Sequence, residues 1–202
     1  NPYIECVLDD HSRVHALHVV IAAGPWSSSL TGGYLKRLPL YPIRGFSLTW
    51  DEEMLSQDTA SSLRGLTGAL MDERYKIAIT PLHAEQSRLR VAGMAMLGPP
   101  SASQTIGLAH QRAAAASLWR IASQWFGNLP QACQPPAKHP TDRFTSVSRP
   151  AGPRLWIGSR PMLPDGLPLI GRLNPASDGS SIWINSGHGS TGWAMAAGSA
   201  CL

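Results

Sequence analysis

Cysteine, charged residues and long apolar runs are all scarce in this chain of 202 residues. Its three cysteines, Cys6, Cys133 and Cys201, lie far apart and form no CxxC pair. That spacing argues against a disulfide scaffold and indicates a reducing compartment, so a cytoplasmic location is expected. No apolar stretch approaches the roughly 18 residues that cross a bilayer. Hydrophobic residues, at 43%, are frequent enough for a folded core, which argues against disorder.

The chain also lacks clustered charge. Charged residues make up 15% of it, and 17 Lys and Arg against 13 Asp and Glu give a formal net charge of +4. The basic residues are scattered and form no run of the kind that binds nucleic acid, so no nucleic-acid partner is expected. A basic surface favours an anionic substrate or peripheral association with the inner face of a membrane. The first five residues hold no initiator Met and no signal peptide, so we expect the chain to begin partway through a fold.

One long helix is expected from about residue 105 to 126, with Ser103 or Thr105 as its cap. Its apolar positions recur at helical spacing and comprise Leu118, Ile121, Ala122 and Trp125. A helical turn over 25–30 and a last helix from about residue 191 complete the helices. Strands are predicted at 3–8, 14–23, 41–50, 66–71, 74–80, 88–94, 145–149, 154–158 and 181–185.

A glycine-rich turn follows the last predicted strand. Its residues, Gly187-His188-Gly189-Ser190-Thr191-Gly192, fit the pattern GxGxxG between a strand and a helix. A dinucleotide site of that type also needs an acidic residue about 20 positions further on, and the chain ends before that point. The glycines still allow a flat ligand to approach the backbone closely, and the start of the next helix favours negative charge. The alternative is that the glycines serve only a tight turn.

Arg160 lies in a segment that is dense in proline and glycine, which holds its backbone stiffly. Its planar guanidinium could bind a carboxylate through two parallel hydrogen bonds. The alternative is a structural ion pair, for which Asp165 is a candidate. These two interpretations stay open on the sequence alone.

Three histidines near the start of the chain do not predict a metal site. His11 falls on a turn, while His15 and His18 are at odd spacing on a predicted strand and point to opposite faces. The chain has no GxSxG motif for a hydrolase nucleophile and no evident carboxylate pair for a glycosidase. No metal is therefore expected.

Several segments together resemble the D-amino-acid dehydrogenase group of the DAO-like, FAD-dependent amine oxidoreductases. They occur in the family's order and span nearly the whole chain. The matching stretches are Val19-Val20-Ile21-Ala22-Ala23-Gly24-Pro25-Trp26, Leu40 to Thr49, Tyr75 to Thr80, Arg90 to Ala95, Trp156 to Gly171, and Trp183 to Trp193.

The resemblance implies a fold and a division into domains. The fold would be α/β, with an α+β substrate part: a partial FAD-binding Rossmann-like domain into which an antiparallel-sheet substrate domain is inserted. Residues 1–37 and 155–202 would belong to the FAD-binding domain, and residues 38–154 would form the substrate-binding domain. The N-terminal strand–GxGxxG–helix that grips the FAD pyrophosphate in the family is missing from this sequence, so we expect a fragment or one half of a longer product.

The resemblance also implies an activity, the oxidative deamination of a small D-amino acid. Hydride would leave the substrate Cα for the flavin N5, and positioning would do most of the work. Arg160 would anchor the substrate carboxylate, and Tyr75 would line the substrate pocket unless it is only a packed strand residue. The cofactor would be FAD, held near Gly24 at its nucleotide part and, along the flavin edge, by Gly187, His188, Gly189, Ser190, Thr191 and Gly192.

The electron acceptor implied by the resemblance is a quinone or similar molecule. A glycine, sarcosine or hydroxyproline oxidase of the same fold is the alternative enzyme. An inactive fragment or subunit that needs a partner is the alternative without activity. Two positions depart from the family's usual residues, since Leu163 stands where Thr is more common and Met96 where an acidic residue is common.

Overall fold

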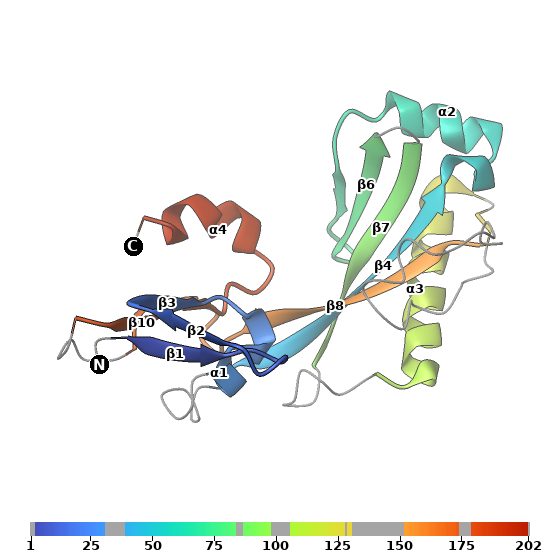
Figure 1. Ribbon diagram of the computed structural model, residues 1–202. Helices are drawn as coiled ribbons and strands as arrows, with labels where there is room; N and C mark the ends of the chain where they lie inside the picture. Colours follow the sequence, from blue (N-terminus) through green and yellow to red (C-terminus); the bar gives the residue numbers. More distant parts are fainter. Residues whose placement is uncertain are drawn as a thin grey trace. The chain divides into compact units, whose positions relative to one another are not determined.

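The computed structural model describes residues 3–30, 39–83, 87–97, 106–127, 129–130, 152–173 and 179–201. The chain divides into two compact units, and most of their helices and strands are labelled in Figure 1. Unit 1 comprises Asn1–Ile43, Leu97–Gln104 and Ser159–Leu202, and unit 2 comprises Arg44–Met96 and Thr105–Gly158. Each unit is thus built from segments that are distant in the sequence.

Unit 1 contains a β-hairpin, a small mixed sheet and short helices. In the sheet, of strand order β3-β10-β9, β10 pairs in parallel with β3 and antiparallel with β9. The hairpin strands pair antiparallel. The elements are β1 (Ile4–Val7), β2 (Arg13–Ala16), β3 (His18–Ile21), η1 (Gly24–Trp26), α1 (Ser27–Leu30), β9 (Leu169–Arg172), β10 (Ser181–Ser186) and α4 (Gly192–Ser199).

The expectation of one strand over residues 14–23 is wrong. The segment forms two strands, because β2 pairs with β1 whereas β3 pairs with β10, and the chain changes partner at Leu17. Among the described residues β3 is an edge strand, and Val20 is 63% exposed despite its apolar character. Hydrophobic content therefore predicted the strand but not its pairing partner.

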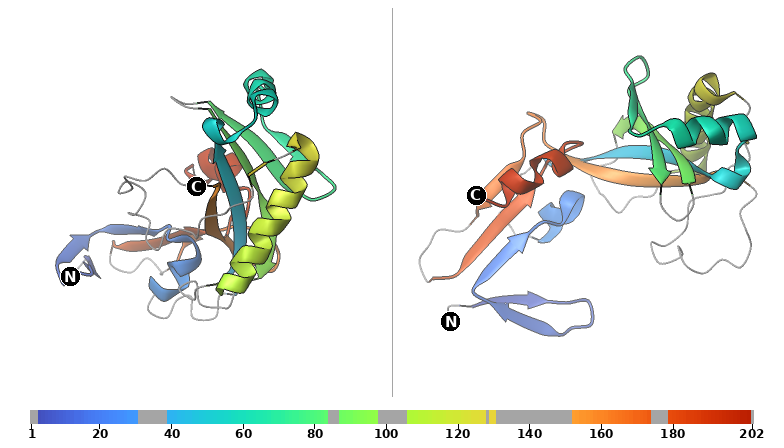
Figure 2. Two further views of the ribbon diagram at one scale, coloured as in Figure 1. Left: turned by 90° about the vertical axis from the view of Figure 1, so that its right-hand side faces the viewer. Right: turned by 90° about the horizontal axis from the view of Figure 1, so that it is seen from above.

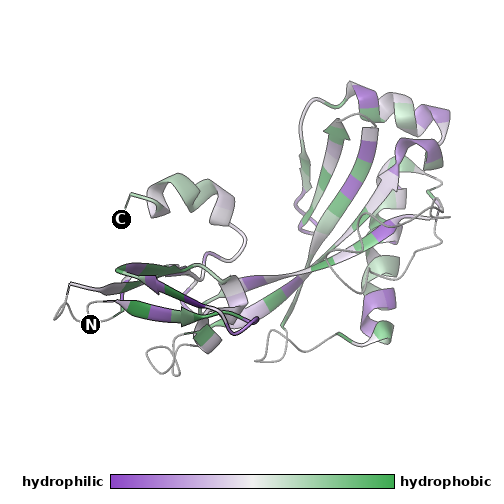
Figure 3. Cartoon of the chain, in the orientation of Figure 1, coloured by the Kyte–Doolittle hydropathy of each residue, from purple (hydrophilic) through white to green (hydrophobic). Residues whose placement is uncertain are grey.

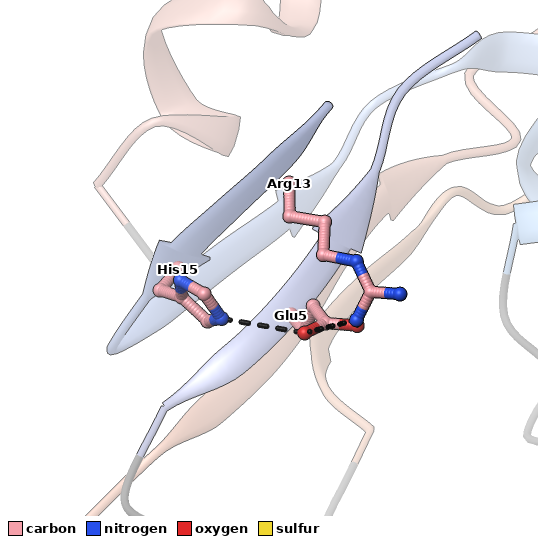
Figure 4. Close-up of polar contacts among 3 residues, drawn as sticks. All are labelled: Glu5, Arg13 and His15. Carbon is pink, nitrogen blue, oxygen red and sulfur yellow. Dashed lines mark hydrogen bonds and ion pairs between the residues drawn. The ribbon is translucent and has the colours of Figure 1, made fainter. Parts of the chain in front are cut away.

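The hairpin carries an ion-pair cluster on its surface (Figure 4). Arg13 donates from one guanidinium nitrogen to both carboxylate oxygens of Glu5, at 2.9 and 3.1 Å, and the His15 ring nitrogen lies 3.3 Å from the same carboxylate. The hydrogen bond from Arg13 lowers the pKa of Glu5 below its ordinary value, and His15 adds to this effect. All three side chains are well exposed, so water and salt screen the cluster.

Replacing Arg13 with alanine is expected to raise the pKa of Glu5, because the largest contribution that lowers it is removed. In the wild type, the lowered pKa of Glu5 stabilises the folded state at pH values above the pKa that Glu5 has in the unfolded chain. This stabilisation is lost as the pH falls through the pKa of Glu5 in the folded state. NMR titration of the Glu5 carboxyl measures the change. Asp10, whose pKa is lowered by Ser12, is the internal control and should not shift. An unchanged titration of Glu5 would contradict the assignment.

Unit 2 is built on a sheet of strand order β5-β6-β7-β4-β8, in which the pairs β5–β6 and β6–β7 are antiparallel. The division into units places the first residues of β4 and the last residues of β8 in unit 1. Helix α3 covers one face of the sheet (Figure 2). The elements are β4 (Tyr41–Asp51), η2 (Glu52–Met54), α2 (Gln57–Gly65), β5 (Leu70–Asp72), β6 (Ile77–His83), β7 (Ser87–Leu97), α3 (Leu108–Phe126) and β8 (Arg154–Met162).

The hydrophobic core of unit 2 lies between α3 and the sheet. Strand residues at alternate positions point toward the helix, because successive side chains of a strand face opposite sides. The core residues on the strands are Phe46, Leu48, Trp50, Ile77, Ile79, Leu89, Val91 and Leu155, and those on the helix are Ala114, Ala115, Leu118, Ile121 and Ala122.

The predicted long helix is present, with two differences. It begins at Leu108 with Gly107 as its N-cap, while Ser103 and Thr105 lie outside the described residues. Trp125 does not join the buried face: it is 52% exposed, and its indole N–H donates to a carboxylate oxygen of Asp72 at 2.9 Å. The polar indole nitrogen therefore draws the ring to the rim of the core rather than into it.

Candidate functional site

The predicted cofactor residues lie at the carboxyl ends of two parallel strands in unit 1. Gly24 follows β3, and the turn that begins at Gly187 follows β10. The two ends are tied together by buried hydroxyl groups: Ser186 Oγ donates to the carbonyl of Gly24 at 3.1 Å, and Ser27 Oγ donates to Ser186 Oγ at 3.2 Å. In open α/β sheets, this edge is where ligands bind.

The segment that follows Arg160 lies directly beside the glycine turn. The backbone N–H of Gly189 donates to the carbonyl oxygen of Pro161 at 2.8 Å, and Met162 forms an antiparallel bridge with His188. A Cβ atom on Gly24 would lie 4.0 Å from the Pro161 ring. The three predicted elements, at Gly24, Arg160 and residues 187–192, therefore converge within one unit.

Two glycines of the turn have a backbone conformation that other residues rarely adopt. Gly187 has φ of 89° and Gly189 has φ of 56°. Added Cβ atoms would lie 3.0 Å from a Leu163 methyl group and 3.2 Å from Met162 Cγ. The glycines are thus needed for the turn itself and for its close packing on β8 and the residue after it, so the tight-turn interpretation accounts for part of the motif.

The polar residues of the turn form hydrogen bonds within the turn and to the end of α4. The Thr191 hydroxyl donates to the carbonyl of His188 at 2.9 Å, and a His188 ring nitrogen lies 3.0 Å from Ser199 Oγ near the end of the helix. Ser190 is exposed, and Gly192 is the first residue of α4. The first N–H groups of a helix have no partner within it, so they are available to an acceptor beside the turn.

Tyr75 belongs to unit 2, in the turn between β5 and β6. Its N–H donates to the Asp72 carboxylate at 3.2 Å, the Arg74 guanidinium lies 5.1 Å from its ring centroid, and its ring packs against the core. The same carboxylate has a lowered pKa, first because of the hydrogen bond from Trp125 and then because of the Tyr75 and Arg74 amides. These contacts account for the conformation of Tyr75, and its predicted role in a substrate pocket stays a prediction.

The three early histidines have separate surroundings. His15 contacts Glu5, and His18 Nδ1 lies 2.7 Å from Ser181 Oγ across the parallel pair. His11 sits in the hairpin turn with φ of 64°. Within the described part of the chain, no three His, Cys, Asp or Glu residues gather in the manner of a metal site, and no helix has the length and apolar character needed to span a membrane.

Comparison with known proteins identifies the family. The profile of the family described as DAO, FAD dependent oxidoreductase, matches residues 4–202. The chain belongs to this family. A curated D-amino acid dehydrogenase of Cereibacter sphaeroides is 35% identical over 182 residues, and one of Rhizobium johnstonii is 34% identical over 198 residues. These alignments cover 90% and 97% of this chain but 33% and 38% of the relatives, so this DAO-family chain spans little more than a third of their length.

Two solved structures share the DAO fold with this chain. Glycine oxidase from Bacillus cereus has a TM-score of 0.56 and 19% identity, over 93% of this chain and 42% of its own. Iminodiacetate oxidase from Chelativorans sp. has a TM-score of 0.53 and 17% identity, over 93% of this chain and 41% of its own. At such low identity the likeness shows the fold, which is the mixed α/β fold of the family, and not the substrate.

Proposed function

We propose that this chain supplies the substrate-anchoring arginine and one flavin-binding edge of an FAD-dependent D-amino acid dehydrogenase. The observation that carries the proposal is the convergence of the Arg160 segment with the glycine turn, held by the Gly189–Pro161 hydrogen bond. The 35% identity to a D-amino acid dehydrogenase supports the substrate class. In this proposal, residues 1–37 and 155–202 belong to the FAD-binding domain, and residues 38–154 form the substrate-binding domain.

The turn fits the pyrimidine edge of a flavin, which alternates carbonyl and N–H groups. The start of α4 at Gly192 offers backbone N–H donors for a carbonyl oxygen. Beside the turn, Asn185 Oδ1 is buried and has no hydrogen-bond partner within the described part of the chain. A buried acceptor of this kind is costly unless a donor reaches it, and a flavin N–H is such a donor. The donor and acceptor groups of the chain thus match both types of group on the ring.

The roles of the chain's own residues follow from their chemistry. Arg160 binds the carboxylate of the amino acid and fixes the direction of its Cα–H bond. Residues 187–192 bind and orient the ring, and Gly24 lies near the nucleotide part. Bound FAD supplies the hydride acceptor. A quinone is the proposed electron acceptor that reoxidises the flavin, and the protein is proposed to associate peripherally with the inner face of the membrane. Both parts of the proposal follow from the family resemblance.

Turnover by a complete enzyme tests the proposal. The chain replaces the aligned segment of the Cereibacter sphaeroides D-amino acid dehydrogenase, and the chimera is assayed with D-alanine, glycine and sarcosine. We expect a yellow protein that reduces a quinone analogue with D-alanine and consumes little oxygen. Hydrogen peroxide formation with glycine or sarcosine would instead identify an oxidase. The two structural neighbours, glycine oxidase and iminodiacetate oxidase, are oxidases by name. A flavin-loaded chimera that no amino acid reduces would overturn both.

A further inference from the structure

His188 connects the glycine turn to β8 and to α4. Its backbone forms the antiparallel bridge with Met162, the last residue of β8. Its carbonyl oxygen accepts two hydrogen bonds from Thr191, one from the backbone N–H at 3.1 Å and one from the hydroxyl at 2.9 Å. One of its ring nitrogens lies 3.0 Å from Oγ of Ser199, the last residue of α4. A single side chain therefore joins the turn to the far end of the helix that follows it.

The His188 side chain lies along the least exposed side of α4. Gly192, Met195 and Ser199 are spaced by three and four residues, so they share one face of the helix. The other five residues of α4 are exposed, whereas Ser199 is only 9% exposed. A Cβ atom added to Gly192 would lie 3.5 Å from His188 Cβ, which is an ordinary contact distance. The side chain of His188 thus begins beside the first residue of α4 and reaches toward the last.

Packing alone gives α4 a weak hold on its direction, because most of the helix is exposed in the described structure. None of its residues is charged or strongly hydrophilic (Figure 3), and its aromatic side chain, Trp193, is 96% exposed. The contrast is with β8, where the Trp156 ring lies so closely over Gly158 that a Cβ atom added to that glycine would collide with Cη2. A polar contact at the end of α4 therefore matters more than it would in a well-packed helix.

The two sides of the glycine turn are held in different ways. On the side of β8, the backbone N–H of Gly189 donates to the carbonyl oxygen of Pro161 at 2.8 Å. On the side of α4, the contact that reaches farthest is the side-chain bond from His188 to Ser199. A hydrogen bond weakens steeply as its geometry departs from linear, so a small rotation of α4 would weaken the donors at its start.

We propose that His188 is a positioning residue whose hydrogen bond with Ser199 holds α4 against the glycine turn and so aligns the backbone N–H groups that bind the flavin edge. This inference rests on the flavin-binding role proposed above for residues 187–192. It gives His188 a different task from the contact with the ring that the resemblance implies, since a nitrogen bonded to Ser199 is turned toward the far end of α4.

NMR of the imidazole nitrogens in the 202-residue chain tests the hydrogen bond without flavin. The ring ¹⁵N resonances of His188 are assigned by their loss in His188→Gln, and Ser199→Ala removes only the hydroxyl that the ring contacts. We expect the Nε2 resonance of His188 to move in Ser199→Ala. His110, which is exposed on α3 in unit 2, is the internal control and should not move. An unmoved His188 resonance would overturn the inference.

The affinity of the chimeric dehydrogenase for FAD, measured by flavin fluorescence, tests the consequence for the site. His188→Ala and Ser199→Ala should each weaken FAD binding about tenfold, and the double variant should be no weaker, because both changes remove the same hydrogen bond. His188→Gln should bind FAD like the wild type, since an amide group both donates and accepts. KM for D-alanine at saturating FAD should stay unchanged in all of them, because the proposed substrate anchor, Arg160, is not altered.

Ser62→Ala, which removes an exposed hydroxyl from α2, is the matched control and should bind FAD normally. If His188→Ala fails to fold by circular dichroism, Ser199→Ala still tests the inference, because it changes only the far end of α4. Additive losses in the double variant, weak binding by His188→Gln, or normal FAD affinity in both alanine variants would overturn this inference and leave the dehydrogenase proposal standing.

The dehydrogenase proposal fails in a different way. A chimera that shows the expected coupling between positions 188 and 199 in FAD affinity, but turns over no amino acid, would overturn the dehydrogenase proposal alone. A chimera that binds no FAD with the wild-type sequence would overturn both.

Discussion

Replacing Arg160 with alanine in the chimeric dehydrogenase is expected to raise KM for D-alanine about 100-fold or more while FAD stays bound. Truncating one member of a hydrogen-bonded charge pair costs about 2–5 kcal/mol, part of which is the penalty for leaving the other charge unpaired. The flavin should remain because the glycine turn contacts Pro161 through backbone atoms, which the substitution does not remove. Steady-state kinetics give KM, and the flavin absorbance gives the cofactor content.

Arg160→Lys separates charge from geometry in the same assay. It keeps the positive charge but presents a single ammonium group, so we expect an intermediate loss of about tenfold. Arg13→Ala, which removes an exposed arginine of the hairpin, is the matched control and should leave KM unchanged. If Arg160→Ala lowered flavin content and thermal stability but left KM unaltered, Arg160 would have a structural role instead of anchoring the substrate.

Replacing Trp50 with alanine is expected to destabilise unit 2 by about 3–5 kcal/mol, the usual cost of deleting a large aromatic ring from a core. Trp50 is fully buried in the cluster between β4 and α3, and its indole N–H donates to the carbonyl of Pro130 at 3.0 Å. The substitution therefore leaves both a cavity and an unpaired carbonyl. Urea unfolding followed by circular dichroism measures the change in free energy.

Trp193→Ala provides the comparison, because Trp193 is 96% exposed in the described structure. Its loss should change the free energy of unfolding by no more than about 0.5 kcal/mol. Trp50→Phe keeps an aromatic ring but removes the hydrogen bond, and it should fall between the two. Equal effects at positions 50 and 193 would show that the core assignment is wrong.

The sequence predicted those parts of the site that depend on local chemistry. The turn at Gly187 was recognisable because several glycines stand between a strand and a helix, and the stiff Arg160 segment was recognisable from its prolines. The helical turn over residues 25–30 is present as η1 and α1. That Gly189 bonds to Pro161 was not predictable, because the two segments are far apart in the chain and only the sheet brings them together.

Other features were missed for physical reasons. Helix α2 has a serine cap, Ser56, whose hydroxyl accepts from the Thr59 N–H, but its mostly polar sequence gives a weak apolar pattern. Strand β5 (Leu70–Asp72) begins four residues later than the strand predicted from residue 66. Strand β9 was not predicted because four residues between glycine- and proline-rich stretches give no clear period. The strand predicted at 145–149 lies outside the described residues.

The stacking of Trp156 over Gly158 makes these two positions interdependent in any later change of the protein. A side chain at 158 would have to displace the indole, whereas a small residue at 156 would leave room for one. A single substitution at 158 therefore requires the indole to move, while the same substitution after shortening 156 does not, so the order in which the two changes are made matters. A library randomised at both positions should recover glycine at 158 wherever a large ring remains at 156.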